Sequence, residues 1–139
     1  YYSGIGVKKD YRKSAEWYQK AVDQDHIYAQ RELGEMYAKG EGVEQNDSTA
    51  VELYRRSASK GSAHAQFLLG EMYAAGRGVE RDDAAAADWI RKAADQNHIF
   101  AQHRLGEMYL EGRGVEKNET EGQRWLDLSR RNGYSEPGY

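Results

Sequence analysis

The sequence of 139 residues predicts an all-α solenoid built from helix–turn–helix repeats. The motif Leu-Gly-Glu-Met-Tyr begins at Leu33, Leu69 and Leu105, an offset of 36 residues each time (69 − 33 and 105 − 69). Apolar residues recur at helical spacing around these motifs. Gly, Asn and Asp recur in phase with them, at the places where helices would end and begin.

The repeat divides the chain into three full copies and part of a fourth. One helix pair cannot bury its apolar face alone, so we expect the copies to stack into a single domain. The predicted divisions are a half repeat at 1–27, full repeats at 28–63, 64–99 and 100–135, together one solenoid over 1–135, and a C-terminal tail at 136–139.

The first helix of each copy is predicted by a stripe of residues four positions apart, such as Ala29, Leu33 and Tyr37. Gly40 and Gly42 predict its end, because the residue after a helix often has a positive φ. The same Gly-x-Gly-Val loop is expected wherever the pattern recurs, at 4–7, 40–43, 76–79 and 112–115.

The second helix of each copy is predicted to start after a polar residue that accepts backbone N–H groups of the first turn. These caps are Asp10, Asn46, Asp82 and Asn118. We expect Trp89 to be buried between helices. In the half repeat the second helix would run over 10–24 and leave an open flank carrying Trp17 and Tyr18, a candidate surface for self-association.

Taken together, these motifs resemble the Sel-1-like repeat family (SLR), a relative of the tetratricopeptide repeats. The resemblance rests on Ala-x(3)-Leu-Gly-x(2)-Tyr, Gly-x-Gly-Val and Ala-x(2)-Trp within one period, over about residues 1–135. It implies a right-handed α/α superhelix of about three and a half repeats. It also implies a non-enzymatic adaptor or scaffold that binds a protein or peptide partner.

The resemblance implies two alternatives as well. One is an immunity or inhibitor protein that neutralises a toxin or enzyme. The other is a protein that binds cell-wall fragments or β-lactams. The family resemblance further favours a bacterial protein of the periplasm or cell envelope, or a secreted one, over a cytoplasmic one.

In such a superhelix the first helices line the concave side, and their residues outside the core are candidate contacts. These residues are Tyr28, Arg31, Glu35, His64, Phe67, Glu71, Phe100, His103 and Glu107. Glu35, Glu71 and Glu107 would form a ladder of carboxylates with rings beside it, which suits a peptide carrying Lys or Arg or a basic patch on a partner. Alternatively, Glu35 and Glu107 only pair within their helices with Arg31 and His103, and the rings pack between repeats.

No catalytic motif is complete. Ser57 and Lys60 have the Ser-x-x-Lys spacing of penicillin-interacting enzymes, but Ser-Asp-Asn and Lys-Thr-Gly elements are missing. The Gly-x-Gly loops follow helices and lack a third glycine, so helix exit explains them better than phosphate binding. We expect no enzyme activity and no cofactor.

Composition excludes further classes. The absence of Cys excludes disulfides and Cys-based metal sites, and the four His lack zinc-protease spacing. His26 and His98 occupy one repeat position and are expected to satisfy backbone groups between helices. A net charge of −3, with basic residues dispersed, argues against nucleic-acid binding. The longest uncharged stretch, Gly61 to Gly70, is too short for membrane insertion.

Overall fold

The computed structural model describes residues 4–24 and 26–135, and this part of the chain forms seven α-helices and no strand. The helices are α1 (Gly4–Asp23), α2 (Ile27–Lys39), α3 (Asp47–Ser59), α4 (Ala63–Ala75), α5 (Asp83–Asp95), α6 (Ile99–Glu111) and α7 (Glu119–Arg131). None of these described helices is long and apolar enough to cross a membrane.

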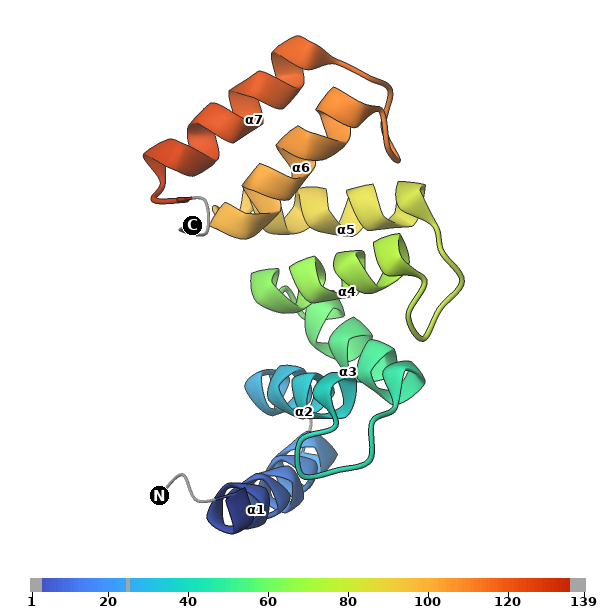
Figure 1. Cartoon of the computed structure of the whole chain (residues 1–139), viewed down its shortest axis with the longest axis vertical. Helices are drawn as coiled ribbons and strands as arrows, with labels where there is room; N and C mark the ends of the chain where they lie inside the picture. Colours follow the sequence, from blue (N-terminus) through green and yellow to red (C-terminus); the bar gives the residue numbers. More distant parts are fainter. Residues whose placement is uncertain (1–3, 25, 136–139) are drawn as a thin grey trace.

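The helices stack one after another along the long axis of the molecule (Figure 1). The most extensive contacts join α2 with α3, α4 with α5, and α6 with α7, and smaller ones join each pair to the next. The all-α solenoid predicted from the repeat is confirmed. We call α2, α4 and α6 the A helices, and α1, α3, α5 and α7 the B helices.

The core is a row of clusters rather than a single centre. Leu33, Leu69 and Leu105 are at most 1% exposed, and each lies in a different cluster. Each fully buried leucine contributes roughly 1.5–3 kcal/mol of transfer free energy. Gly34 lets an A helix approach its B helix closely, since a Cβ atom there would lie 2.7 Å from the Tyr54 ring. In the Leu-Gly motif, the leucine therefore fills the core and the glycine allows the two helices to pack closely.

The predicted loops are present in the three full copies. Gly40 and Gly42 have φ of +71° and +77°, so both occupy the left-handed region that favours glycine. A Cβ atom on Gly42 would also lie 2.3 Å from the carbonyl oxygen of Tyr11 in α1. Each such loop is thus fixed by its contact with the preceding B helix.

The prediction at the N-terminal end is wrong. Residues 4–7 are helical, α1 begins at Gly4, and Asp10 lies inside the helix instead of capping it. The physical reason lies in the other copies, where Gly42 and its equivalents rest on the backbone of a preceding B helix. Among the described residues no B helix precedes 4–7, so the contact that fixes the other loops is missing there.

The other predicted caps are confirmed. The side-chain oxygen of Asn46 accepts from the Thr49 N–H at 3.1 Å, and Asp82 and Asn118 do the same at 3.0 Å for their own third residues. Each of these residues has extended backbone angles, as an N-cap residue should. The Asn and Asp residues therefore set the start of α3, α5 and α7.

One repeat position holds three tryptophans in three environments. Trp125 is buried at 8% exposure, whereas Trp17 on the open flank of α1 is 67% exposed. Trp89 was expected to be buried between helices but is only half-buried, with the Lys92 ammonium 4.3 Å from the centre of its ring. Trp89 lies at the margin of a core cluster, and the ammonium group of Lys92 lies over its ring.

Candidate functional site

The nine predicted contact residues form one stripe on each A helix, at its second, fifth and ninth residues. We call this surface the A-helix stripe. Tyr28 and Phe100 are 51% and 52% exposed, and the other seven residues are half-buried. Phe100 contacts a ring of the preceding copy, as the alternative expectation had it, and still leaves about half of its surface exposed.

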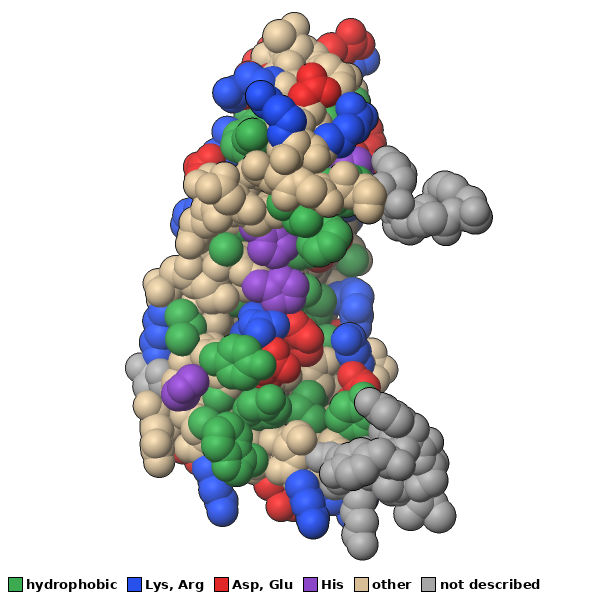
Figure 2. Space-filling model, turned by 90° about the vertical axis from the view of Figure 1, so that its left-hand side faces the viewer, with side chains coloured by type: hydrophobic (Ala, Val, Ile, Leu, Met, Phe, Trp, Pro, Cys, Tyr) green, Lys and Arg blue, Asp and Glu red, His purple; other side chains and the backbone are tan. Residues whose placement is uncertain are grey.

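Rings from different copies gather into a cluster, which we call the ring cluster. Its members are His64, Phe67, His98, Phe100, His103 and Tyr134. Phe67 stacks on His98 with 4.9 Å between ring centres, and His103 stacks on Tyr134 at 4.0 Å. Phe100 lies beside both Phe67 and Tyr134, at 6.5 and 6.0 Å. Figure 2 shows histidine and hydrophobic side chains gathered along the middle of one face.

Two histidines of the ring cluster also take part in a chain of hydrogen bonds that links the three full copies. The Ala101 N–H donates to Nδ1 of His98 at 3.2 Å. Nε2 of His98 lies 3.0 Å from Nδ1 of His64, and Nε2 of His64 lies 3.2 Å from Oε1 of Glu35. Because His98 accepts at Nδ1, its proton sits on Nε2 and is donated to His64, which in turn donates to Glu35. We call this the His–His–Glu chain.

This chain shifts the ionisation of both its ends. The hydrogen bond from His64 holds the pKa of the Glu35 carboxyl below its usual value. Burial, followed by the charge of His64, lowers the pKa of His98 to about 4. Both shifts favour a neutral His98 and an ionised Glu35 at neutral pH, which is the state that the hydrogen bonds require.

The predicted ladder carboxylates are engaged within the protein. Glu35 lies 3.0 Å from Arg31 in its own helix, and Glu71 in α4 lies 2.9 Å from Nε of Arg104 in α6. Glu107 lies 3.8 Å from the same Arg104. Of these pairs, only Glu71–Arg104 connects neighbouring A helices, but all three reduce the negative charge that the stripe presents to a partner.

The pairs within one helix that were expected as the alternative are also present. They are Arg31–Glu35 at 3.0 Å and His103–Glu107 at 3.6 Å. A pair of this kind contributes only about 0.2–0.5 kcal/mol when it is exposed. Such pairs can form on any exposed helix. The contacts between copies form only in the folded solenoid, and they distinguish this surface from an ordinary helix surface.

A depression of about 320 Å³ opens between α2 and α4. It is lined by Glu35, Ala38, Lys39, Tyr54, His64, Leu68, Glu71, Met72 and Arg77. Tyr54 and Met72 belong to the core, and burial raises the pKa of the Tyr54 hydroxyl. The remaining lining carries both signs of charge, so the depression suits a side chain with an apolar stem and a polar end.

The rejected catalytic motifs prove to be structural. Ser57 is 0% exposed and donates from Oγ to the Ile27 carbonyl at 3.0 Å, so it joins α3 to α2. Buried in this way, Ser57 offers no accessible nucleophile for β-lactam chemistry. No group of His, Asp or Glu suited to a metal ion occurs among the described residues.

The histidine prediction for the linker positions is confirmed. His26 and His98 are the N-caps of α2 and α6, where each Nδ1 accepts a backbone N–H. Ser62 performs the same task for α4 with its hydroxyl. His98 therefore has two tasks, since its other ring nitrogen reaches His64.

Sequence reasoning missed the role of the glutamine in the repeated Ala-Gln pair. Gln66 is buried in α4, donates from Nε2 to the Ala58 carbonyl at 3.2 Å and accepts from Gln96 at 2.9 Å. Gln102 donates to the Ala94 carbonyl and accepts from Asn132 in the same way. The signal available in the sequence was a glutamine that recurs beside a buried alanine in every full copy.

A model of the Sel1 repeat family matches residues 1–26, 27–62, 63–98 and 99–134. The chain therefore belongs to the Sel1 repeat family. Proteins built from this repeat generally serve as protein-interaction scaffolds and are typically non-catalytic. Among curated proteins, no match was found.

Three solved structures with the same fold come from bacteria. The chain is 36% identical to c5321, described as a protective antigen of uropathogenic Escherichia coli strains with an SLR fold, over 86% of this chain and 26% of that one, with a TM-score of 0.84. A Sel1 repeat protein from Oxalobacter formigenes is 37% identical over 84% of this chain and 88% of that one, with a TM-score of 0.76. Cysteine rich protein B of Helicobacter pylori is 26% identical over 92% of both chains, with a TM-score of 0.71.

Proposed function

We propose that this chain is a non-enzymatic adaptor that binds a segment of a protein partner along the A-helix stripe. The observation that carries the proposal is the exposure of Tyr28 and Phe100, which lie half out of the surface on a stripe whose carboxylates are paired internally. Exposed aromatic side chains on a stable, ordered surface are typical anchors of protein recognition.

The arrangement of the stripe suggests how a partner would be held. The ring cluster offers flat apolar surface to an aliphatic or aromatic side chain of the partner. The depression between α2 and α4 would accept a second side chain further along the segment. Glu71 and Glu107 border this path, and a Lys or Arg of the partner would compete with Arg104 for them. The favoured partner is thus an apolar segment with a flanking basic residue.

Selection of binding peptides from a random phage-displayed library tests this proposal. Peptides selected on the wild-type chain should bind the variant Phe100→Ser at least ~10-fold more weakly, because Phe100 is the exposed centre of the ring cluster. The same peptides should be enriched in aromatic or aliphatic residues next to Lys or Arg.

The matched control is Trp17→Ser, which removes another exposed aromatic side chain, on α1 and outside the A-helix stripe. Peptides that bind the stripe should tolerate this change. Binding that survives Phe100→Ser but is lost in Trp17→Ser would place recognition on α1 and overturn the proposal.

A further inference from the structure

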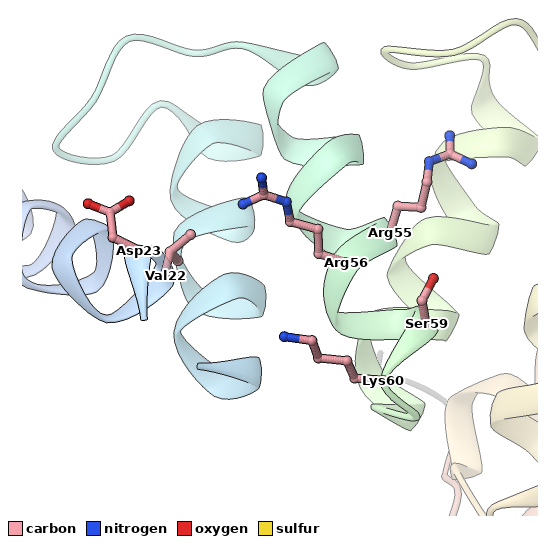
Figure 3. A pocket seen from close by; sticks show the side chains of 6 residues that line it. All are labelled: Val22, Asp23, Arg55, Arg56, Ser59 and Lys60. Atoms are coloured by element: carbon pink, nitrogen blue, oxygen red, sulfur yellow. The ribbon is translucent and has the colours of Figure 1, made fainter. Parts of the chain in front are cut away.

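A second depression lies on the B helices, away from the A-helix stripe. It has a volume of about 690 Å³ and is lined by Val22, Asp23, Arg55, Arg56, Ser59 and Lys60. In Figure 3, Arg56 and Lys60 extend from α3 toward α1. Arg55 and Ser59 occupy the neighbouring flank of α3 (Figure 3). We call this surface the basic depression.

The basic depression is not a general feature of the repeat. The position of Ser59 is held by Asp23 in α1 and by Asp95 in α5, so those helices place a carboxylate where α3 has a hydroxyl. The position of Lys60 is held by Gln96 after α5. The last turn of α7 also carries two cations, Arg130 and Arg131, but Arg130 is paired with Asp127 at 3.3 Å. Among α1, α3 and α5, only α3 combines several cations with no acidic residue in its last turn.

Two of the cations lack an acidic partner. Arg55 lies over the Tyr73 ring at 5.8 Å, and Arg56 is exposed. Neither forms an ion pair with any described residue. The one carboxylate in the lining, Asp23, accepts a hydrogen bond from Gln19 at 3.2 Å. By contrast, arginines such as Arg77 and Arg104 are paired with carboxylates. The depression is thus locally positive on a chain with a net charge of −3.

We infer that the basic depression binds an acidic segment of a protein partner, a short stretch in which Asp or Glu side chains recur. One carboxylate would pair with the Arg56 guanidinium, whose planar fork matches a carboxylate, and the next would pair with Arg55. The lining holds only three cations beside the carboxylate of Asp23, and the chain as a whole has a net charge of −3, whereas a nucleic acid needs a longer basic track. This feature favours an acidic peptide over a nucleic acid.

This inference does not depend on the function proposed for the A-helix stripe. The basic depression and the stripe share no residue, and the depression is lined by α1, α3 and the residue that follows α3. A chain with both surfaces could hold a basic, apolar segment on its A helices and an acidic segment on its B helices at the same time. That is the arrangement an adaptor requires.

The test uses fluorescence anisotropy with a fluorescein-labelled peptide in which Glu alternates with Ser, added to the whole chain. The wild type should bind this peptide at low salt and should not bind the same peptide with Gln in place of Glu. Arg55→Glu combined with Arg56→Glu should weaken binding at least ~10-fold, because it replaces two attractions by two repulsions. Equal binding of the Glu and Gln peptides would overturn the inference.

A matched control carries the same change of charge elsewhere. Arg130→Glu with Arg131→Glu alters two cations in the last turn of another B helix, α7. This variant should bind the Glu peptide like the wild type, and both variants should keep wild-type circular dichroism. Equal weakening in the two variants would mean that net charge alone is responsible, which contradicts a site at α3. A labelled DNA duplex bound as tightly as the Glu peptide would also contradict it.

Discussion

At the scale of single residues, the clearest constraint is the place of Gly42. Its positive φ and its 2.3 Å approach to the Tyr11 carbonyl act together, whereas Gly61 has a φ of +99° and no neighbour within 4 Å of an added Cβ atom. Gly61→Ala should therefore cost about 1–2 kcal/mol, which is the conformational penalty alone. Gly42→Ala should cost clearly more, since the loop must also move off α1.

Urea denaturation of the two variants checks this difference. The larger loss of stability in Gly42→Ala follows from contact with the preceding B helix. Equal losses in both variants would mean that conformation alone fixes the loop and that the contact with Tyr11 adds nothing.

The three tryptophans at one repeat position allow a graded prediction. Trp125 is 8% exposed, so Trp125→Ala should cost about 3–5 kcal/mol. Trp89 is half-buried, and Trp89→Ala should cost about 1–3 kcal/mol. Trp17 is 67% exposed, and Trp17→Ala should change stability by less than about 0.5 kcal/mol. Chemical denaturation gives all three values, and any other order would contradict the burial that the structure describes.

At the scale of helices, the start of α6 should make stability depend on pH. The pKa of His98 is about 4 in the folded chain and near 6.5 when unperturbed, so the unfolded chain binds the proton more readily between these values. The lowered pKa of Glu35 acts in the same direction below its usual value of 4.5. Stability should therefore be complete above pH 6.5 and decrease as the pH falls toward 4.

The melting temperature measured across this range checks the prediction. The control is His98→Ser, because Ser62 already caps α4 with a hydroxyl at the same repeat position. This variant keeps a cap but loses the titrating ring, so its melting temperature should fall less between pH 6.5 and 4. The same slope in both proteins would assign the acid sensitivity to groups other than His98.

The helices also show what sequence can predict. Each full copy carries its own start and stop signals, so α2 to α7 were predictable from Asn46, Gly40 and their equivalents. The signals at residues 4–10 look the same in sequence but lie within α1. A glycine permits a loop without enforcing it, and the enforcing contact belongs to a neighbouring helix.

At the scale of the whole molecule, the candidate site was predictable only in outline. The 36-residue period identified which side of each A helix faces outward, and the structure keeps those residues on one stripe. The period did not reveal that His64 contacts His98, or that Arg104 pairs with Glu71, because each contact joins residues more than 30 positions apart. Pairing within one helix could be predicted for Glu35 and Glu107, whereas the contacts of Glu35 with His64 and of Glu71 with Arg104 join different copies.

The hydrogen bond between His64 and His98 has a consequence for how such chains change over time. Repeat arrays lengthen when one unit is duplicated and inserted, and the buried leucines and glycines of this chain would accept a new unit at any junction. An inserted unit between α4 and α6 would nevertheless separate the two imidazoles and divide the ring cluster. The order of the units therefore determines this surface, even though the solenoid fold itself does not depend on that order.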